Sequence, residues 1–566
     1  MRSTTRRAFT LAVAALFVSA VSACDEDVVA PDPVVVPTGL AAASTSTTTV
    51  RVSWNQAGDA TSYEVDRAVG AGALANVKTG LTTTFFEDVG LTPATAYRYV
   101  VRSVRGTEKS AATVEVSVTT GAAGPKVAVV NSVPLSRTFF ADTTYVLSGF
   151  VKVSNGATLT IQAGTRIVGD TLVAGSSLWI LRGAKIAANG TAAAPIVFTS
   201  QRAVGSRAPG DWGGIVIVGN ALINRTANPI FTEGPTGGAE NYAGGNNAND
   251  NSGSLKYVRI EFAGYDVSNG AGQELNSISS YAVGRGTTYD YVQSMAGLDD
   301  SFEFWGGGVD VGHMVSFEAG DDHFDWTEGY QGRGQYLIAL QTSVIAPRPG
   351  SGTVSSDPRG FEGDGCENDK AGCTYANTPY SAPVWANFTL VGPGTGVFST
   401  TDGSGAVVRR GSGGTFVNGL IARWPGVGMS IRDAESGALM NLDSLYVRGV
   451  LLAENGNNFE ATANGRFGDR LNTNKVAWKV TEGQLADVFV GTLPGKTTDV
   501  TTGNVNIALK AGAAAATAGL NSFAGTPIAD RVTSFFGATM PATAYVGAVD
   551  PVGAKWYEGW TNWARK

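Results

Sequence analysis

Two stretches of sequence, Asp299-Asp300-Ser301-Phe302-Glu303 and Asp321-Asp322-His323-Phe324-Asp325, decide the fold. They share one pattern, two acidic residues, a polar residue, a phenylalanine and a further carboxylate, at an offset of 22 residues. A second internal repeat aligns residues 158–167 with residues 177–186, at an offset of 19. Offsets near about 20 residues between short β-rich segments are typical of coils that stack on one another. We therefore predict an all-β chain whose main part is a right-handed parallel β-helix.

The predicted β-helix covers residues 127–566, where short strands are separated by Gly and Asn. A β-sandwich is the competing architecture, and it would place Asn-Gly turns between paired strands. The pairs Asn155-Gly156 and Asn189-Gly190 instead fall at the expected coil corners. The open end of a β-helix exposes strand edges and needs a cover. We expect a C-terminal cap there, formed by Trp556, Trp560 and Trp563.

Residues 38–120 carry a different pattern, short strands with period-two alternation. One such strand ends in Trp54, and the motif Leu91-Thr92-Pro93-Ala94-Thr95-Ala96-Tyr97 follows further on. The early tryptophan and the Leu-x-Pro-x-Thr-x-Tyr corner resemble those of the fibronectin type III domain. This resemblance implies a β-sandwich in which the Tyr97 hydroxyl bonds to the backbone. The module would serve as a spacer or as a ligand-binding domain.

The predicted β-helix also resembles secreted bacterial parallel β-helix proteins of uncharacterised function, many of which are lipoproteins. The resemblance spans most of residues 140–566 and implies the β-helix fold, but no accepted activity. The stretches that carry it are Gly210-Asp211-Trp212-Gly213-Gly214-Ile215, residues 299–307, residues 320–329, Arg409-Arg410-Gly411 and Gly559-Trp560-Thr561-Asn562.

The N-terminus has the pattern of an export signal. Arg2, Arg6 and Arg7 precede an uncharged run, residues 8–23, that is too short for a typical membrane span. Val21-Ser22-Ala23-Cys24 resembles the bacterial lipobox, which implies a signal peptide at residues 1–23 and a lipid on Cys24. An ordinary secretory signal with a chance cysteine is the alternative, and the arginine pair also fits a twin-arginine signal. Residues 24–37 are acidic and rich in proline, as expected of a tether.

This N-terminal pattern places the protein in the cell envelope, anchored through Cys24 to a bacterial membrane, with the outer membrane or the cell surface as the expected site. It does not distinguish the two export routes or the two leaflets.

Composition excludes several classes of function. Among 566 residues, 41 Lys and Arg against 48 Asp and Glu give a net charge of -7, which argues against a nucleic-acid binder. Two histidines exclude a multi-histidine metal site, and three cysteines exclude zinc ribbons and iron–sulfur clusters. Once Cys24 is lipidated, Cys366 and Cys373 remain, and in an exported chain we expect them to form a local disulfide.

The stretch from Asp299 to Glu328 holds the strongest chemical signal. If 22 residues make one coil, Asp299 stacks beside Asp321 and Glu303 beside Asp325, about 4.8 Å apart. Phe302 and Phe304 would be buried, and the carboxylates and His323 would form an outward patch with Asp300, Asp322 and Glu328 at its margins. Carboxylates this close repel one another, so at least one pKa rises unless a cation lies between them.

Three interpretations of this patch remain open. The first is structural, with the Asp side chains accepting backbone N–H bonds or holding Ca²⁺ between coils. The second is a sugar-binding surface, in which flat aromatic rings stack on the sugar; the candidates are Trp305, Trp326 and Tyr330. The third is catalysis on polysaccharide, by a Ca²⁺-dependent lyase with Arg333 as the base, or by an inverting hydrolase that uses Asp299 and Glu303.

A second acidic loop holds Glu362, Asp364 and Asp369 beside the expected disulfide, and it is either a Ca²⁺ site or a solvated loop. The Gly-His-Gly signature of polygalacturonases is absent, since His313 precedes Met314 and His323 precedes Phe324. The sequence therefore favours a lipid-anchored surface protein that binds an extracellular glycan or a protein partner, with Ca²⁺ as the candidate cofactor. A polysaccharide lyase or hydrolase and an architectural envelope protein are the alternatives, and the sequence does not decide whether the protein is an enzyme.

Overall fold

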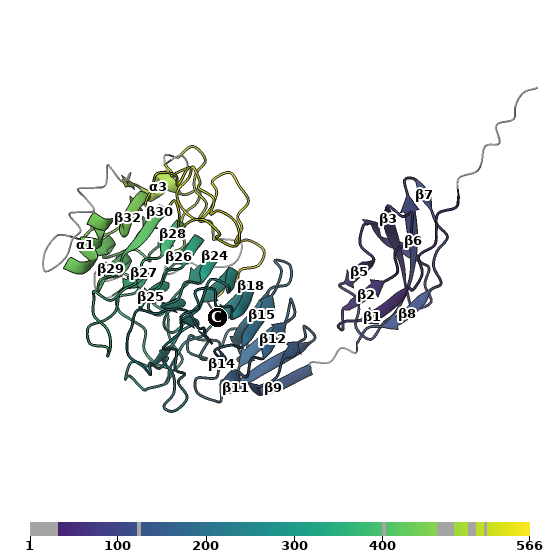
Figure 1. The fold of residues 1–566 in the computed structure, drawn as a ribbon, viewed down its shortest axis with the longest axis horizontal. Coiled ribbons are helices and arrows are strands. Elements are labelled where there is room, and N and C mark those ends of the chain that lie inside the picture. Colours follow the sequence, from purple (N-terminus) through teal and green to yellow (C-terminus); the bar gives the residue numbers. More distant parts are fainter. Residues whose placement is uncertain are drawn as a thin grey trace, which may run out of the picture. The chain divides into compact units, whose positions relative to one another are not determined.

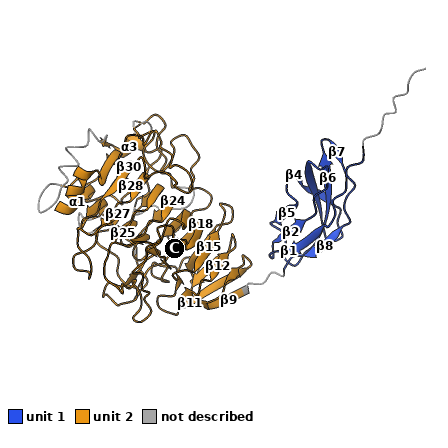
Figure 2. Ribbon diagram, viewed as in Figure 1, with its two compact units in different colours: residues 1–123 blue, residues 124–566 orange. Residues whose placement is uncertain are grey.

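The computed structural model describes residues 32–121, 126–398, 403–460, 480–495, 505–513 and 518–565. The chain divides into two compact units, residues 1–123 and 124–566 (Figures 1 and 2). The predicted signal peptide and Cys24 lie outside the described residues. Within the described ranges, no helix has the length and hydropathy that a membrane crossing requires.

The first unit is a β-sandwich of antiparallel strands. Its core contains Trp54, which packs edge-on against Tyr63 at a centroid distance of 5.3 Å. The Tyr97 hydroxyl accepts a hydrogen bond of 2.8 Å from the Thr92 backbone N–H, as the tyrosine corner predicts. One sheet contains β1 (Ala41–Ser44), β2 (Thr49–Ser53) and β5 (Phe85–Val89); the other contains β3 (Ser62–Val69), β4 (Ala75–Leu81), β6 (Ala96–Arg105), β7 (Glu108–Lys109) and β8 (Val116–Thr119).

The second unit is a parallel β-helix, in which a sheet of 24 strands winds through successive coils. The early strands are β9 (Lys126–Val133), β10 (Arg137–Phe139), β11 (Thr143–Val153), β12 (Thr158–Ile161), β13 (Arg166–Gly169), β14 (Ser177–Ile180), β15 (Lys185–Asn189), β16 (Ile196–Ser200), β17 (Ile215–Val218) and β18 (Gly253–Glu261). The later ones are β21 (Ile278–Tyr281), β22 (Thr288–Met295), β23 (Phe302–Trp305), β24 (Asp310–Phe317), β25 (Phe324–Thr327), β26 (Arg333–Leu340), β27 (Arg359–Asp364), β28 (Val384–Val391), β29 (Ser404–Arg409), β30 (Gly414–Ala422), β31 (Val427–Ile431), β32 (Leu445–Ala453), β33 (Asn457–Phe459) and β34 (Thr481–Gly483).

Two short strands and two short α-helices lie outside this sheet. A short hairpin, β19 (Tyr265–Asp266) and β20 (Glu274–Leu275), projects after β18. Two short helices, α1 (Ala434–Leu439) and α3 (Leu485–Val488), lie near the C-terminal coils.

Of the two predicted repeats, one has the length of a coil and the other does not. The offset of 22 is confirmed, because β23 and β25 pair in parallel with Phe302 beside Phe324 and Glu303 beside Asp325. The offset of 19 is wrong as a coil length, because β12 pairs with β15, which places Thr158 beside Lys185. The segments aligned at 19 residues share a strand–turn–strand sequence, but β12 and β14 lie on different faces of the coil.

Aromatic side chains fill the centre of the β-helix where the acidic repeat begins. The rings of Phe302 and Phe324 stack at 5.1 Å, and Phe304 stacks on Tyr330 at 4.7 Å. All four are buried in one continuous core. Because such rings each remove about 150–250 Å² from water, this column is a large part of what holds the neighbouring coils together.

A column of residues with left-handed backbone runs along one flank of the β-helix. Its members occupy matching positions on neighbouring strands and have φ between +48° and +64°: Tyr257, Tyr291, His313, Tyr336, Asn387, Asn418 and Gly449. The aromatic members stack, with ring centroids 4.4 Å apart for Tyr257 and Tyr291 and 4.1 Å apart for Tyr291 and His313. This backbone shape turns the side chains outward, so the flank needs a cover.

The C-terminal segment provides that cover. Trp560 packs against Tyr257 and Tyr291, and Trp556 packs edge-on against His313. Asn562 and Gln293 exchange two hydrogen bonds, which fix the segment further. The expectation that Trp556, Trp560 and Trp563 cap the open end is therefore wrong: they lie on the flank of the middle coils, where the column presents its rings.

Candidate functional site

Three carboxylates on consecutive coils face the same way. Glu303 of β23 lies beside Asp325 of β25, and Asp325 lies beside Glu362 of β27, all in register. Strand alternation explains this, because Phe302, Phe324 and Phe361 immediately before them point into the core. These carboxylates form the floor of a cavity of about 330 Å³, which we call the acidic groove.

Four aspartates lie at the coil corners just before β23 and β25 and also line the acidic groove: Asp299, Asp300, Asp321 and Asp322. Two of them tie one coil to the next. Asp300 accepts a hydrogen bond of 2.8 Å from the Asp322 backbone N–H, and Asp322 accepts one from the Arg359 backbone N–H. One oxygen of Asp300 and one of Asp322 therefore accept backbone N–H bonds from the next coil.

Carboxylates of the floor and of the coil corners also face one another closely. Oxygens of Asp299, Asp300 and Asp321 lie within 4.8 Å of one another, and so do those of Asp300, Glu303 and Asp325. Within the described residues, one buried oxygen of Asp321 and one of Asp325 have no hydrogen-bond partner. Buried acceptors without partners are costly, so this arrangement favours an external donor or a cation.

Burial and mutual repulsion shift these groups. Burial, reinforced by Asp321 and Glu274, raises the pKa of Asp299. Burial, together with Glu362 and Glu303, raises the pKa of Asp325. Burial, reinforced by Asp364, raises the pKa of Glu362 to about 7 although Arg359 and Arg409 oppose the shift. Without a cation, part of the groove therefore stays protonated near neutral pH.

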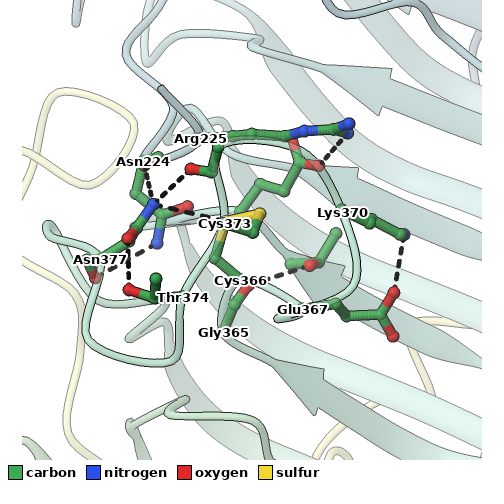
Figure 3. Close-up of a disulfide and its surroundings, with 12 residues drawn as sticks. Asn224, Arg225, Gly365, Cys366, Glu367, Lys370, Cys373, Thr374 and Asn377 are labelled. Carbon is green, nitrogen blue, oxygen red and sulfur yellow. Dashed lines mark hydrogen bonds and ion pairs between the residues drawn. A yellow bond between two sulfur atoms is a disulfide. The ribbon is translucent and has the colours of Figure 1, made fainter. Parts of the chain in front are cut away.

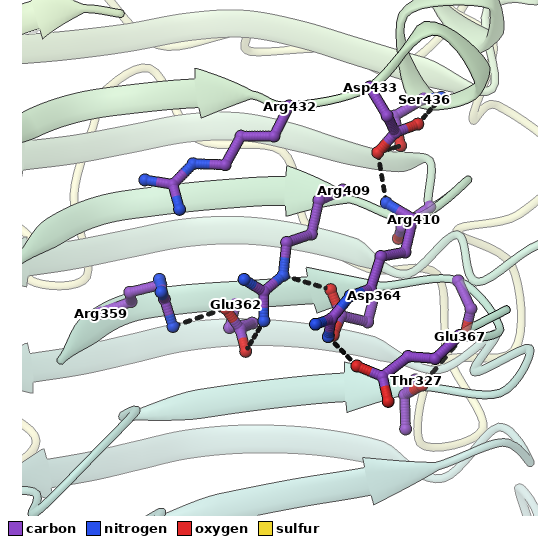
Figure 4. Close-up of polar contacts among 12 residues, drawn as sticks. Thr327, Arg359, Glu362, Asp364, Glu367, Arg409, Arg410, Arg432, Asp433 and Ser436 are labelled. Atoms are coloured by element: carbon purple, nitrogen blue, oxygen red, sulfur yellow. Dashed lines mark hydrogen bonds and ion pairs between the residues drawn. The ribbon is translucent and has the colours of Figure 1, made fainter. Parts of the chain in front are cut away.

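Arginines of the next coil contact the last carboxylates of the acidic groove (Figure 4). Arg409 lies beside Asp364 in register and contacts Asp364 and Glu362, each at 2.8 Å. Arg410 pairs with Asp364 and with Glu367. Burial alone would lower the pKa of Arg409, but Asp364 and Glu362 outweigh it and raise that pKa. Arg409 therefore keeps its charge.

The loop closed by the disulfide (Figure 3) contributes Glu367 and Lys370 to the lining of the groove. Cys366 is bonded to Cys373, and the Ala371 carbonyl accepts a hydrogen bond of 2.9 Å from Arg225. The loop holds Lys370, whose ammonium lies 4.6 Å from the centre of the Trp305 ring and 3.0 Å from Glu367. The loop thus supplies one positive charge and covers the one tryptophan of the groove lining.

Comparison with known proteins identifies the larger unit. A family model described as a pectate-lyase-like β-helix domain matches residues 132–500. The chain belongs to this family. No curated protein matches the chain significantly.

Solved structures similar to parts of the chain carry fibronectin type III names. One is a Fn3-like protein from Clostridium thermocellum, with 34% identity, 14% of this chain and 86% of that chain covered, and a TM-score of 0.14. Another is the FN5 domain of Drosophila Lar, with 19% identity, 15% and 95% covered, and a TM-score of 0.14. A third is a human FNIII domain, with 22% identity, 19% and 94% covered, and a TM-score of 0.16.

Two of the three predicted sugar-stacking residues are unavailable in this pectate-lyase-like β-helix. Trp326 and Tyr330 are each 0% exposed in the aromatic core, and the Tyr330 hydroxyl donates to the Val309 carbonyl. Trp326 follows the inward Phe324 by two positions, so strand alternation turns it inward as well. Trp305 follows the inward-facing Phe304 by one position, so it faces outward and lines the acidic groove.

Three further predicted groups lie elsewhere. His323 points inward and bonds to Ser316, because it precedes β25 at a coil corner where strand alternation does not hold. Glu328 is buried outside the groove, between Arg225 and Tyr242. Arg333 is buried on the flank, paired with Asp310, so it cannot serve the groove as a base.

Three carboxylates of the groove were not predicted as site residues: Glu233, Glu274 and Glu367. They come from loops and a hairpin that leave the coils, and no sequence period marks them. Glu362 and Asp364 were expected on a separate loop, but both lie on β27 and join the first patch. Asp369 does not line the groove.

Proposed function

We propose that this β-helix binds an extracellular polysaccharide in the acidic groove, with Ca²⁺ held between the carboxylates and the sugar. The observation that carries the proposal is the in-register column of Glu303, Asp325 and Glu362 on three consecutive coils. A repeating column of this kind matches a chain-like ligand better than a single small molecule.

The spacing of the oxygens suits a calcium ion. Ca²⁺ takes about six to eight oxygen ligands at roughly 2.3–2.6 Å, so one ion can bridge oxygens up to about 5 Å apart. The two carboxylate triads, whose oxygens lie within 4.8 Å, fall inside this limit. Three protein ligands leave coordination positions for sugar oxygens. The ion would also relieve the repulsion that raises the carboxylate pKa values.

A lyase has weaker support than binding. A lyase needs a basic residue that can take a proton beside the cation. Arg333 lies on the flank, and Arg409 is held in its charged form by Asp364 and Glu362, which raise its pKa.

A hydrolase is the second candidate function. Glu303 and Asp325 belong to a triad whose oxygens lie within 4.8 Å of one another. This is shorter than the roughly 6.5–9.5 Å of inverting enzymes and close to the roughly 5–5.5 Å of retaining ones. Glu303 and Asp325 therefore fit the geometry of a retaining hydrolase better than that of an inverting one. An enzyme of this kind would release sugar products.

The deciding experiment is a panel of neutral and acidic polysaccharides, incubated with the purified protein in Ca²⁺ and in EDTA. Retention in Ca²⁺ and release in EDTA supports the proposed binding, and product formation supports the hydrolase. Asp325→Asn should lose retention, whereas the exposed Glu435→Gln on α1, outside the groove, should keep it. If no polysaccharide is retained or cleaved, an architectural envelope role takes the place of both.

The proposed location rests on the sequence around Cys24, which supports export and a lipid anchor in a bacterial envelope. There the first unit would hold the β-helix away from the membrane surface.

A further inference from the structure

A second cavity adjoins the acidic groove. Its volume of about 640 Å³ lies within the roughly 300–1,000 Å³ typical of ligand sites. We call it the aromatic cavity, because the rings of Phe150 and Tyr265 form part of its lining. The other lining residues used below are Ala174, Pro235, Asp266 and Thr353.

The aromatic cavity and the acidic groove share two walls. Asp266 of β19 pairs in register with Glu274 of β20; Asp266 lines the cavity and Glu274 lines the groove. Glu233 and Pro235 lie two positions apart on one loop, and again one lines the groove and the other the cavity. A ligand chain that leaves the groove past these walls therefore enters the aromatic cavity.

The cavity wall is held in place by hydrogen bonds. The Asp266 backbone N–H donates to the Ser351 carbonyl at 2.8 Å, and the Tyr265 hydroxyl donates to the Gly350 carbonyl at 3.2 Å. The Val267 backbone N–H donates to the Gln273 carbonyl at 3.0 Å within the hairpin. A wall fixed in this way loses little conformational entropy when a ligand binds.

The charges of the cavity select an uncharged ligand. Of the described residues that line it, none is Lys or Arg, so an anionic sugar would find no counter-charge there. Burial alone would raise the pKa of Asp266, but hydrogen bonds from Ser268 and Gly270 outweigh it and lower that pKa. Asp266 is therefore ionised and repels anions, while the partly exposed rings of Phe150 and Tyr265 supply apolar surface for a sugar ring.

Resting on the proposed function, we propose that the aromatic cavity is a second subsite for the same polysaccharide and takes an uncharged sugar residue next to the one held at the acidic groove. The bound chain then runs from the carboxylate column past Glu274 and Asp266 toward Phe150. The preferred ligand is a chain in which charged and uncharged sugars adjoin.

Blocking the cavity tests this proposal. Ala174 and Thr353 are both exposed residues of the lining, so Ala174→Trp and Thr353→Trp fill the space without disturbing the core. Leu172→Trp is the matched control, because Leu172 is 92% exposed in the same turn as Ala174 but does not line the cavity. The probes are oligogalacturonates of equal length, fully de-esterified or partly methyl-esterified, together with neutral oligosaccharides. Affinities are measured calorimetrically in Ca²⁺.

We expect Ala174→Trp and Thr353→Trp to lose about tenfold in affinity for chains that contain uncharged sugars, equivalent to about 1.4 kcal/mol, with Leu172→Trp unchanged. The affinity for Ca²⁺ alone should not change. If both blocking variants bind every retained glycan as the wild type does, the subsite is refuted while the proposed function stands. A loss confined to fully charged chains refutes the uncharged-sugar assignment. Failure of the wild type to bind any glycan removes both proposals.

Discussion

Glu303 and Asp325 lie directly beside each other on β23 and β25, and oxygens of both belong to one cluster within 4.8 Å. Burial, reinforced by Glu233, raises the pKa of Glu303, and burial, reinforced by Glu362 and Glu303, raises the pKa of Asp325. A protein that keeps such a pair on adjacent coils loses folding stability unless a proton or a cation neutralises it. The dependence of its stability on calcium and on pH distinguishes neutralisation by a cation from neutralisation by a proton.

Replacing Asp325 by Asn should abolish stabilisation by calcium. The melting temperature of the wild-type protein should rise with the Ca²⁺ concentration. At a hundredfold excess of Ca²⁺ over Kd, the free energy of unfolding should increase by about 2.7 kcal/mol. Asn keeps the shape of Asp325 but loses its charge, so Asp325→Asn should show a much smaller rise and should be at least as stable as wild type in EDTA. Glu435→Gln should behave as wild type. Calorimetric scans measure these melting temperatures. If Ca²⁺ does not raise the melting temperature of the wild-type protein, the proposed cation site is refuted.

The stability of the calcium-free protein should fall as pH rises. Burial raises the pKa values of Asp299, Glu303 and Asp325 in the folded state, and it raises that of Glu362 to about 7 against an ordinary 4.5. A carboxyl group whose pKa is raised by folding contributes its full stability at a pH below its pKa in the unfolded chain. That stability is lost as the pH rises through its pKa in the folded protein. Each titrating group changes the free energy of unfolding by up to about 1.4 kcal/mol per pH unit. In EDTA, the melting temperature should therefore drop between about pH 5 and pH 7, and saturating Ca²⁺ should flatten the curve. A flat curve in EDTA would contradict this.

Part of this site was predictable because the acidic repeat and the strand period coincide. The 22-residue repeat gave Glu303 beside Asp325, and the inward Phe302 and Phe304 are where alternation puts them. The same alternation, carried one coil further, turns Trp326 inward with Phe324, so its burial was also within reach of the sequence.

The rest depended on contacts that no local pattern encodes. His323 precedes its strand, so the strand period does not set its direction. Glu233 and Glu274 reach the groove from segments whose path depends on tertiary packing. Trp556 and Trp560 cover the flank because a column of left-handed residues exposes rings there, and the backbone shape of that column is invisible in the sequence.

Replacing Cys24 by Ser should release the protein from membranes. The lipobox-like Val21-Ser22-Ala23-Cys24 makes the Cys24 thiol the expected acceptor of the lipid, and serine lacks the thiol. Wild-type protein should partition into the membrane pellet and the detergent phase, and Cys24→Ser into the soluble fraction. Ser22→Thr keeps the thiol and serves as the control. Persistence of Cys24→Ser in detergent-free membrane pellets would refute the anchor.

Replacing Lys370 by Gln should strengthen calcium binding. The Lys370 ammonium lies 4.6 Å from the centre of the Trp305 ring and 3.0 Å from Glu367. Its positive charge therefore neutralises part of the negative charge that a bound cation would otherwise neutralise. Lys370 is partly exposed, so solvent screening limits the effect to about 1 kcal/mol, or roughly fivefold in Kd. The matched control is Lys555→Gln, which breaks an equivalent pair, Lys555 and Glu558 at 3.0 Å with the same spacing of three residues, away from the groove. Calorimetric titration with Ca²⁺ should show tighter binding for Lys370→Gln only. Equal affinities in both variants would mean that Lys370 does not compete with the ion, and that the disulfide loop serves only as a wall of the groove.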